Sequence, residues 1–171
     1  QTVLMPRNVH KSIINTCILG NLQPVFFDLP FLSDRGHMAP PDEVWFENIL
    51  EHSSDLSLNI AAVILVNPTY QGYSSQIEDI IELIHSRNWP VLVDESHGSY
   101  FGCKIKENLP KSALNSGADL VVNSLHKSAS GLAQTAVLWQ KGNRIDSGSV
   151  EKCIALLQTS SPSSLLLASC E

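Results

Sequence analysis

Short runs of apolar residues recur along this chain, and segments with a helical spacing of apolar positions lie between them. An apolar run closed by proline, glycine or charged residues indicates a strand, and a run without alternation indicates a strand buried on both faces. On this basis we expect strands at residues 3–5, 24–29, 61–66, 91–93, 120–122 and 135–139.

The segments between the strands carry the 3.6-residue spacing of amphipathic helices. In the first of them, Ile13, Ile14, Cys17 and Ile18 fall on one face. In the clearest of these segments, Ile77, Ile80, Ile81 and Ile84 share one face. The residues at its start, Ser75-Gln76-Ile77-Glu78, fit a capping box. We predict helices at residues 10–19, 41–52, 77–84, 112–116 and 150–158, a further helix from residue 164, and loops at 31–40 and 99–110.

Strands that alternate with helices at these spacings favour βαβ units. The expected fold class is therefore a three-layer α/β/α domain with a mostly parallel sheet of about six strands. The last strand follows its predecessor after a connection too short for a parallel crossover, so we expect it to run antiparallel. The sequence contains no internal repeat and no linker, and its 171 residues suit a single domain.

Composition narrows the class of protein. Apolar residues make up 43% of the chain and charged residues 16%, as in globular proteins. The net charge of −6 argues against a nucleic-acid partner. The 4 cysteines form no CxxC pair, which indicates reduced thiols of a cytoplasmic protein with neither a disulfide framework nor a metal site. No apolar run approaches the roughly 18 residues of a membrane span, and no signal peptide is visible.

Polar residues with catalytic chemistry follow three of the expected strands. The carboxyl ends of parallel strands share one edge of the sheet, where open α/β folds bind ligands, so we expect these residues to meet there. A lysine at that edge acts as a nucleophile when partly desolvated. The residues are His10 after the first strand, the acidic pair Asp94-Glu95 with His97 after residues 91–93, and Ser124, His126 and Lys127 after residues 120–122.

A lysine, a carboxylate and nearby imidazole and hydroxyl donors are the groups that bind pyridoxal phosphate. Lys127 would form the Schiff base, and Asp94 would keep the pyridine nitrogen protonated. Ser124 and His126 would hydrogen-bond the phosphate. A structural explanation stays open for each residue taken alone, since Asp94 or His10 also suits a helix or turn cap and Lys127 also suits the surface.

Five segments of the chain carry polar residues in a characteristic order. They are Met5-Pro6-Arg7-Asn8-Val9-His10-Lys11-Ser12, Asn67-Pro68-Thr69-Tyr70-Gln71-Gly72, Asp94-Glu95-Ser96-His97-Gly98, Ser124-Leu125-His126-Lys127 and residues 158–169. Together these segments resemble the major domain of the bacterial ornithine/lysine/arginine decarboxylases. The resemblance covers essentially the whole chain and implies the aspartate-aminotransferase fold (fold type I) of pyridoxal-phosphate enzymes.

The resemblance implies a role for each matching residue. It assigns Lys127 to the Schiff base, Asp94 to the pyridine nitrogen and His10 to stacking on the cofactor ring. The other cofactor contacts that it implies are Ser124 and His126 at the phosphate, Ser96 under the ring with His97 beside it, and Thr69 near the phenolic oxygen.

The function implied by the resemblance is pyridoxal 5′-phosphate-dependent decarboxylation of lysine, arginine or ornithine to the corresponding amine. It implies a cytoplasmic enzyme of polyamine biosynthesis that works as a homodimer or higher homo-oligomer. The family also has a phosphate-binding loop before the first segment and a small C-terminal domain, and nothing in this chain corresponds to them. We therefore expect residues 1–171 to be a partial major domain, inactive in isolation, with an unpaired strand edge at residues 135–139.

Three alternatives stay open. The lysine and the aspartate are shared across the fold group, so an aminotransferase or another amino-acid lyase is the nearest. A non-catalytic family member acting by binding is the second. The third is an ATPase, because residues 91–97 also read as a strand that ends in a DExH box, although the chain has no GxxxxGK[ST] phosphate loop.

Overall fold

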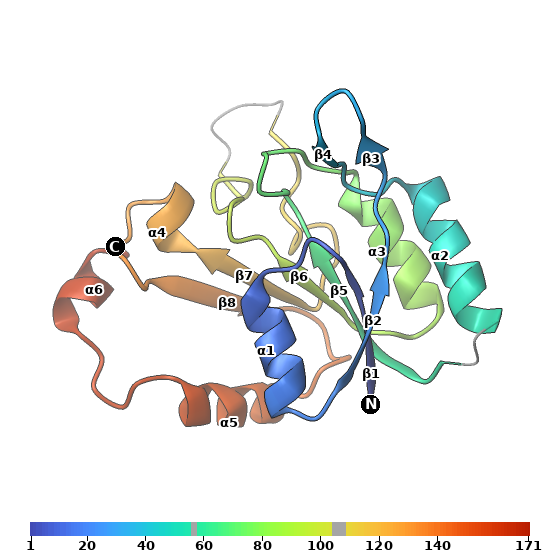
Figure 1. Cartoon of the computed structure of the whole chain (residues 1–171). Coiled ribbons are helices and arrows are strands. Elements are labelled where there is room, and N and C mark those ends of the chain that lie inside the picture. Colours follow the sequence, from blue (N-terminus) through green and yellow to red (C-terminus); the bar gives the residue numbers. More distant parts are fainter. Residues whose placement is uncertain (56–57, 104–108) are drawn as a thin grey trace.

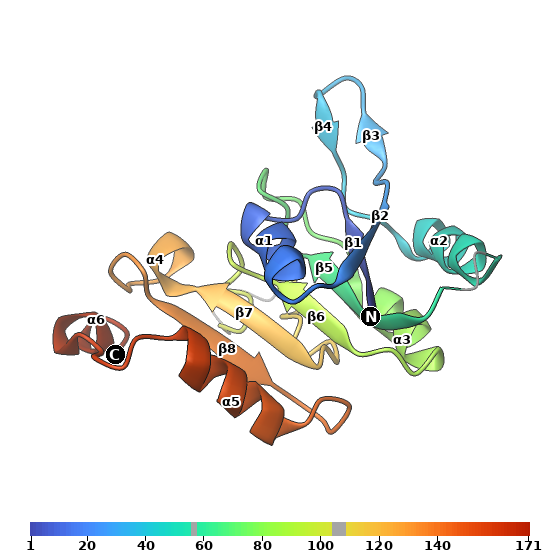
Figure 2. The ribbon, with the colours of Figure 1, turned by 60° about the horizontal axis from the view of Figure 1, so that its bottom comes forward.

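The computed structural model describes residues 1–55, 58–103 and 109–171, and its centre is a six-stranded sheet (Figures 1 and 2). Helices α2 and α3 cover one face of this sheet, and α1 lies on the other. The strands are β1 (Thr2–Pro6), β2 (Gln23–Phe27), β5 (Ile60–Val66), β6 (Val91–Asp94), β7 (Leu120–Ser124) and β8 (Ala136–Gln140). The helices are α1 (Lys11–Leu19), α2 (Glu43–Asp55), α3 (Ile77–Ser86), α4 (Leu125–Ser128), α5 (Ser147–Leu157) and α6 (Ser164–Ala168).

The strand order is β2-β1-β5-β6-β7-β8. Neighbouring strands are parallel except for β8, which runs antiparallel to β7 with Val121 opposite Trp139. Between β7 and β8 the chain forms only the one-turn helix α4 and a short loop, too little for a parallel crossover. The predicted fold class is therefore confirmed, including the reversed last strand.

The main core lies between the sheet and the helices α2 and α3. Side chains alternate along β5 and β6, so Val63, Val91 and Val93 point into this layer, where each is at most 2% exposed. The isoleucine face of α3 packs against them, and Phe46 of α2 is 0% exposed. The helical spacing of the isoleucines is thus explained by burial on one side.

The opposite face of the sheet is covered only in part. Helix α1 packs Cys17 and Ile13 against β1 and its neighbours, but Ile14 is 37% and Ile18 73% exposed. The prediction that Ile18 lies on the buried face was wrong, because α1 reaches β1, β2 and Ile64 of β5 and no further. Helix α1 does not cover the part of this face that β6 and β7 form, and residues of these two strands line a cavity there.

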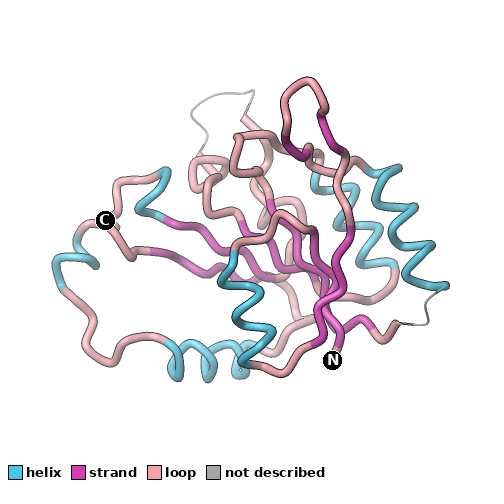
Figure 3. Tube along the Cα trace, in the orientation of Figure 1, coloured by secondary structure: helices cyan, strands magenta, loops and turns pink. Residues whose placement is uncertain are grey.

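Two predictions of local structure were also wrong. Residues 31–40 contain a hairpin of β3 (Phe31–Leu32) and β4 (His37–Met38), which projects beyond the sheet (Figure 3). Gly36, at a φ of 69°, provides the left-handed residue that the turn needs. Residues 112–116 form a turn and not a helix, since the chain reverses at Gly117, with a φ of 104°.

The predicted capping box before α3 does not form. The N-cap is Gln76 without a side-chain hydrogen bond, and the Ser75 amide donates to Asn67 Oδ1 at 3.1 Å. Glu78 pairs with Lys111. Ser75 therefore belongs to the loop after β5, and its hydroxyl does not cap the helix. Among the described residues, no helix is long and apolar enough to cross a bilayer.

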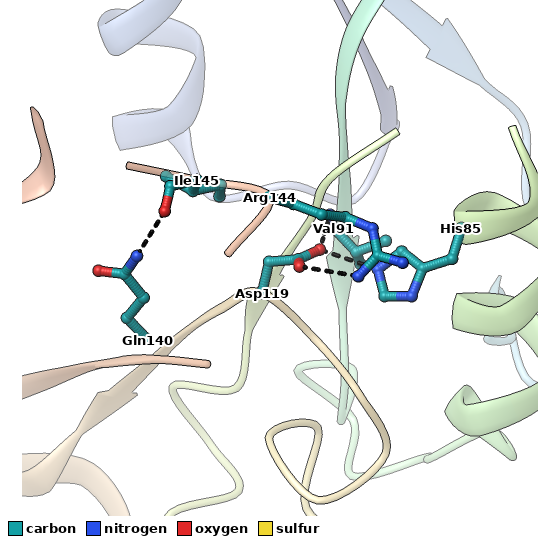
Figure 4. Close-up of polar contacts among 6 residues, drawn as sticks. All are labelled: His85, Val91, Asp119, Gln140, Arg144 and Ile145. Atoms are coloured by element: carbon teal, nitrogen blue, oxygen red, sulfur yellow. Dashed lines mark hydrogen bonds and ion pairs between the residues drawn. The ribbon is translucent and has the colours of Figure 1, made fainter. Parts of the chain in front are cut away.

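A buried carboxylate joins the elements at the amino end of β7 (Figure 4). Asp119 is 1% exposed and accepts hydrogen bonds from the Val91 amide and from His85 Nε2, both at 2.8 Å. Arg144 Nη1 lies 3.5 Å from the same carboxylate. Asp119 thus ties α3, β6 and the segment after β8 together at the edge opposite to Lys127.

Candidate active site

A cavity of about 480 Å³ lies over β6 and β7 on the α1 side of the sheet. Its volume is within the range of small-molecule binding sites. Its floor is apolar, and most of its polar residues stand at the ends of β6 and β7 and at the start of α1. The lining consists of His10, Ser12, Ile13, Ile64, Leu92, Val93, Asp94, Ser96, Leu120, Val122, Ser124, His126, Lys127 and Leu138.

Strand alternation explains why the predicted residues meet. Asp94 of β6 is paired with Val122 of β7, and both line the cavity. Ser124 lies two residues beyond Val122 and therefore points to the same face. The short helix α4 then follows directly and carries Lys127. The structure thus brings the ends of the two strands together as the sequence predicts.

Lys127 lies next to a histidine. Its Nζ is 3.4 Å from Nε2 of His97, whose ring packs edge-on against Tyr70 with the ring centres 5.4 Å apart. Burial lowers the pKa of His97, the positive charge of Lys127 lowers it further, and Asp94 opposes both. His97 is therefore neutral at neutral pH. Lys127 is exposed, and the partial desolvation expected from the sequence is not observed.

His10 caps a helix and lines the cavity at the same time. Its Nδ1 accepts a hydrogen bond from the Ser12 amide at 3.3 Å and lies 2.8 Å from the Ser12 hydroxyl, at the N-terminus of α1. Because Nδ1 is the acceptor, the neutral ring carries its proton on Nε2. The cap thereby fixes the ring at the cavity, so capping the helix does not exclude the predicted contact of His10 with a cofactor.

Three further lining residues, Asp94, Ser124 and His126, come from the ends of β6 and β7 and from α4. Asp94 is half-buried, and its Oδ1 accepts from the Ser96 amide at 3.1 Å. Ser124 is 8% exposed, and its hydroxyl does not cap α4. His126 Nδ1 lies 2.8 Å from the Thr135 carbonyl oxygen, which only accepts, so Nδ1 donates. Nε2 of His126 thus becomes a donor only when the ring is protonated.

Thr69 is not among the residues that line the cavity. It is 1% exposed, and its hydroxyl oxygen accepts from the Tyr73 amide at 3.2 Å within the turn after β5. The neighbouring Asn67 has no predicted role, and its backbone lies next to the site. Its backbone amide donates to the Asp94 backbone carbonyl at 3.1 Å. Its Nδ2 is buried and has no partner among the described residues.

Glu95 points away from the cavity, although it belongs to the acidic pair at the end of β6. It is 2% exposed on the opposite face of the sheet. Burial raises the pKa of its carboxyl, and hydrogen bonds from the Ala113 amide and from Asn123 oppose that shift. Of the two acidic residues at the end of β6, Asp94 therefore lines the cavity and Glu95 is buried on the opposite face of the sheet.

The residues of the cavity fit pyridoxal phosphate. They present an amine, a carboxylate, two imidazoles and hydroxyl groups around one apolar floor. No group of three His, Cys, Asp or Glu side chains in the described ranges could hold a metal ion.

Comparison with known proteins gives a family and several relatives. Residues 1–171 match the family model "Orn/Lys/Arg decarboxylase, major domain". The arginine decarboxylase of Bacillus cereus is 35% identical over 167 residues, which are 98% of this chain and 35% of that protein. The arginine decarboxylase of Halalkalibacterium halodurans is 35% identical over 171 residues, 99% of this chain and 33% of that protein. The chain thus spans about a third of the length of the curated relatives it matches.

Solved structures share the fold. Aspartate aminotransferase from Thermotoga maritima has a TM-score of 0.69 at 18% identity, over 99% of this chain and 43% of that chain. A pyridoxal-phosphate-bound C-S lyase from Staphylococcus hominis has a TM-score of 0.69 at 12% identity, over 99% of this chain and 42% of that chain. Family and fold support pyridoxal 5′-phosphate as the cofactor and give the ATPase alternative no support. The chain belongs to the Orn/Lys/Arg decarboxylase family and matches its major domain over residues 1–171.

Proposed function

We propose that the full-length natural protein decarboxylates a basic amino acid with pyridoxal 5′-phosphate. The observation that carries this proposal is the single cavity lined by Lys127, Asp94, His10, Ser124 and His126. Arginine is the first substrate to test, because the curated relatives at 35% identity are named arginine decarboxylases. Lysine and ornithine are the other members of the same substrate class.

Lys127 and Asp94 are proposed to hold opposite ends of the cofactor ring, with His97 next to the lysine. Lys127 would attach it covalently through Nζ, and His97, 3.4 Å away and neutral, would accept a hydrogen bond or a proton from that amine. Asp94 would accept a hydrogen bond from the protonated ring nitrogen. When bound, the cofactor supplies an electron sink for the electron pair left by the departing carbon dioxide.

Other residues are proposed to hold the ring and the phosphate. Ser124 and a protonated His126 would donate to phosphate oxygens, with the His126 ring oriented by the Thr135 carbonyl. His10, fixed by its cap on α1, would stack on the ring, and the small side chain of Ser96 would leave room beneath it. Thr69 near the phenolic oxygen stays a prediction from the resemblance.

The test is product analysis with arginine, lysine and ornithine in separate reactions. The full-length protein with added cofactor should release carbon dioxide and form the amine from at least one of them. Lys127→Ala should abolish both the cofactor's lysine-bound absorbance and amine formation. Lys152→Ala, at an exposed site on α5, is the matched control and should change neither.

Two other products would overturn this function. A keto acid formed from the amino acid would indicate an aminotransferase. Bound cofactor without turnover of any of the three substrates would indicate a member that acts by binding alone.

We further propose that the protein acts as a homodimer or higher homo-oligomer in the cytoplasm, in polyamine biosynthesis, and that residues 1–171 alone are inactive. The support is the family match together with its extent, because the chain spans about a third of its curated relatives. Light scattering of the full-length protein should give a multiple of the monomer mass. Amine formation by residues 1–171 alone would contradict the proposed inactivity.

A further inference from the structure

Behind the cavity, on the other face of the sheet, a chain of hydrogen bonds joins β6, β7 and β8. Trp139 Nε1 donates to Asn123 Oδ1 at 2.9 Å. Asn123 Nδ2 donates to the Glu95 carbonyl at 3.0 Å and to Glu95 Oε2 at 3.2 Å. The Ala113 amide donates to Glu95 Oε1 at 2.7 Å. Glu95 and Asn123 are only 2% and 6% exposed, so the bonds between them are protected from water, whereas Trp139 is 46% exposed.

The indole of Trp139 fixes the direction of these hydrogen bonds. An indole nitrogen only donates, so the oxygen of Asn123 must face Trp139 and its amide nitrogen must face Glu95. Both Glu95 oxygens then meet donors, from Asn123 and from Ala113. A carboxylate satisfies both donors, whereas a side-chain amide places an N–H group against one of them.

These hydrogen bonds lie where the backbone pairing of β6 with β7 ends. Strand β6 ends at Asp94, and the last bond between the two backbones runs from the Glu95 amide to the Val122 carbonyl at 3.0 Å. Beyond it, the Asn123 side chain reaches across to the Glu95 carbonyl. A side chain thus continues the pairing of β6 and β7 after their backbones have separated.

This contact stands directly behind the site. Glu95 follows Asp94 and Asn123 precedes Ser124, and in each pair the two side chains point to opposite faces. A shift between Glu95 and Asn123 therefore moves Asp94 relative to Ser124. Burial of the carboxylate is unfavourable by itself, so packing alone does not account for an acid at this position.

We propose that Glu95 and Asn123 are positioning residues that set the distance between Asp94 and the segment from Ser124 to Lys127. This inference rests on the proposed function, since it takes these groups to hold opposite ends of one cofactor. It requires no contact between Glu95 and the cofactor.

The test compares Glu95→Gln, Trp139→Phe and the double variant in the full-length protein. Glu95→Gln should weaken cofactor binding about tenfold, because it sets donor against donor, and should shift the absorbance of the bound cofactor. Trp139→Phe removes the donor that holds Asn123 Oδ1 and leaves the bonds from Asn123 and Ala113 to Glu95 in place, so it should weaken cofactor binding less than Glu95→Gln. Both changes act through Asn123, so the loss of affinity in the double variant should be smaller than the sum of the two single losses. Glu151→Gln on α5, an exposed carboxylate, is the matched control.

A second readout needs no cofactor. In the cofactor-free protein, hydrogen exchange of residues 120–128 should be faster in Glu95→Gln than in the control, with an unchanged far-ultraviolet circular dichroism spectrum. If Glu95→Gln does not fold, Trp139→Phe alone should show the same changes on a smaller scale.

Wild-type cofactor affinity in Glu95→Gln, or a loss in the double variant equal to the sum of the two single losses, would overturn the inference. Failure of the proposed function looks different, since the wild type would then bind cofactor and form no amine.

Discussion

The amine of Lys127 lies 3.4 Å from Nε2 of His97, so a residue that lines the cavity is next to a histidine that is not among the lining residues. The positive charge of Lys127 lowers the pKa of His97, and the negative charge of Asp94 at the end of β6 raises it. This arrangement joins two sequence motifs that lie about thirty residues apart. It makes His97 the group through which the protonation of the site is most easily measured.

We predict that His97 titrates below its ordinary pKa of 6.5. Lys127→Met should raise this pKa by removing the nearby positive charge, and Asp94→Asn should lower it further. Since the folded-state pKa is depressed, His97 contributes stability above pH 6.5 that is lost as the pH falls through the folded pKa. Nuclear magnetic resonance titration of the ring checks all three values. Shifts of the same sign in the two variants would contradict this electrostatic account.

His126 offers a test of orientation. Asparagine places an amide donor near the position of Nδ1, so His126→Asn should keep the contact with the Thr135 carbonyl, and glutamine should lose it. Neither variant can carry the positive charge that the proposed phosphate contact places on His126, so both should bind pyridoxal phosphate about tenfold or more weakly. Only His126→Gln should also lower the thermal midpoint of the cofactor-free protein. Equal cofactor affinity in wild type and both variants would remove His126 from the phosphate site.

Asp119 should matter for stability and not for the site. Its Oδ2 accepts from the Val91 amide and from His85, and Arg144 lies 3.5 Å from its Oδ1, so the amide group of an asparagine would face either Arg144 or those two donors (Figure 4). We expect Asp119→Asn to lower the free energy of unfolding by about 3 kcal/mol. Urea denaturation measures this, with Glu82→Gln, an exposed residue of α3, as the control within about 0.5 kcal/mol. A loss no larger than that of the control would mean that the contacts of the Asp119 carboxylate contribute little to the free energy of unfolding.

Glu95 should give the protein a distinct dependence on pH. Burial raises its pKa above the ordinary value of 4.5, so the folded state holds this proton more tightly than the unfolded chain. Stability should therefore fall as the pH rises from 4.5 through the raised pKa, and Glu95→Gln should remove that part of the slope. Urea denaturation at several pH values compares the two proteins. Parallel curves would show that Glu95 titrates as it does in the unfolded chain.

The strands were predictable from sequence because each is an apolar run with clear ends, and the reversal of β8 followed from the length of one connection. The convergence of Asp94 with Ser124 and Lys127 followed from the rule that parallel strands end at one edge. Local polar details were less predictable. Ser75 has the sequence of a cap, but Asn67 of the preceding loop binds its amide.

Residues that depend on distant parts of the chain were the hardest to place. Strand alternation indicates that Glu95 faces away from Asp94, but nothing near Glu95 in the sequence identifies its partners Ala113 and Asn123. Ile18 has the spacing of a buried residue, yet it is 73% exposed because α1 covers only one end of the sheet.

The central claim is that Lys127 holds the cofactor. Borohydride reduction of the full-length protein loaded with pyridoxal phosphate, followed by proteolysis and mass spectrometry, tests it directly. The account predicts one modified peptide that carries the reduced cofactor on Lys127, and none in Lys127→Ala. A cofactor fixed to another lysine, or an unmodified Lys127 in a protein that forms the amine, would contradict it.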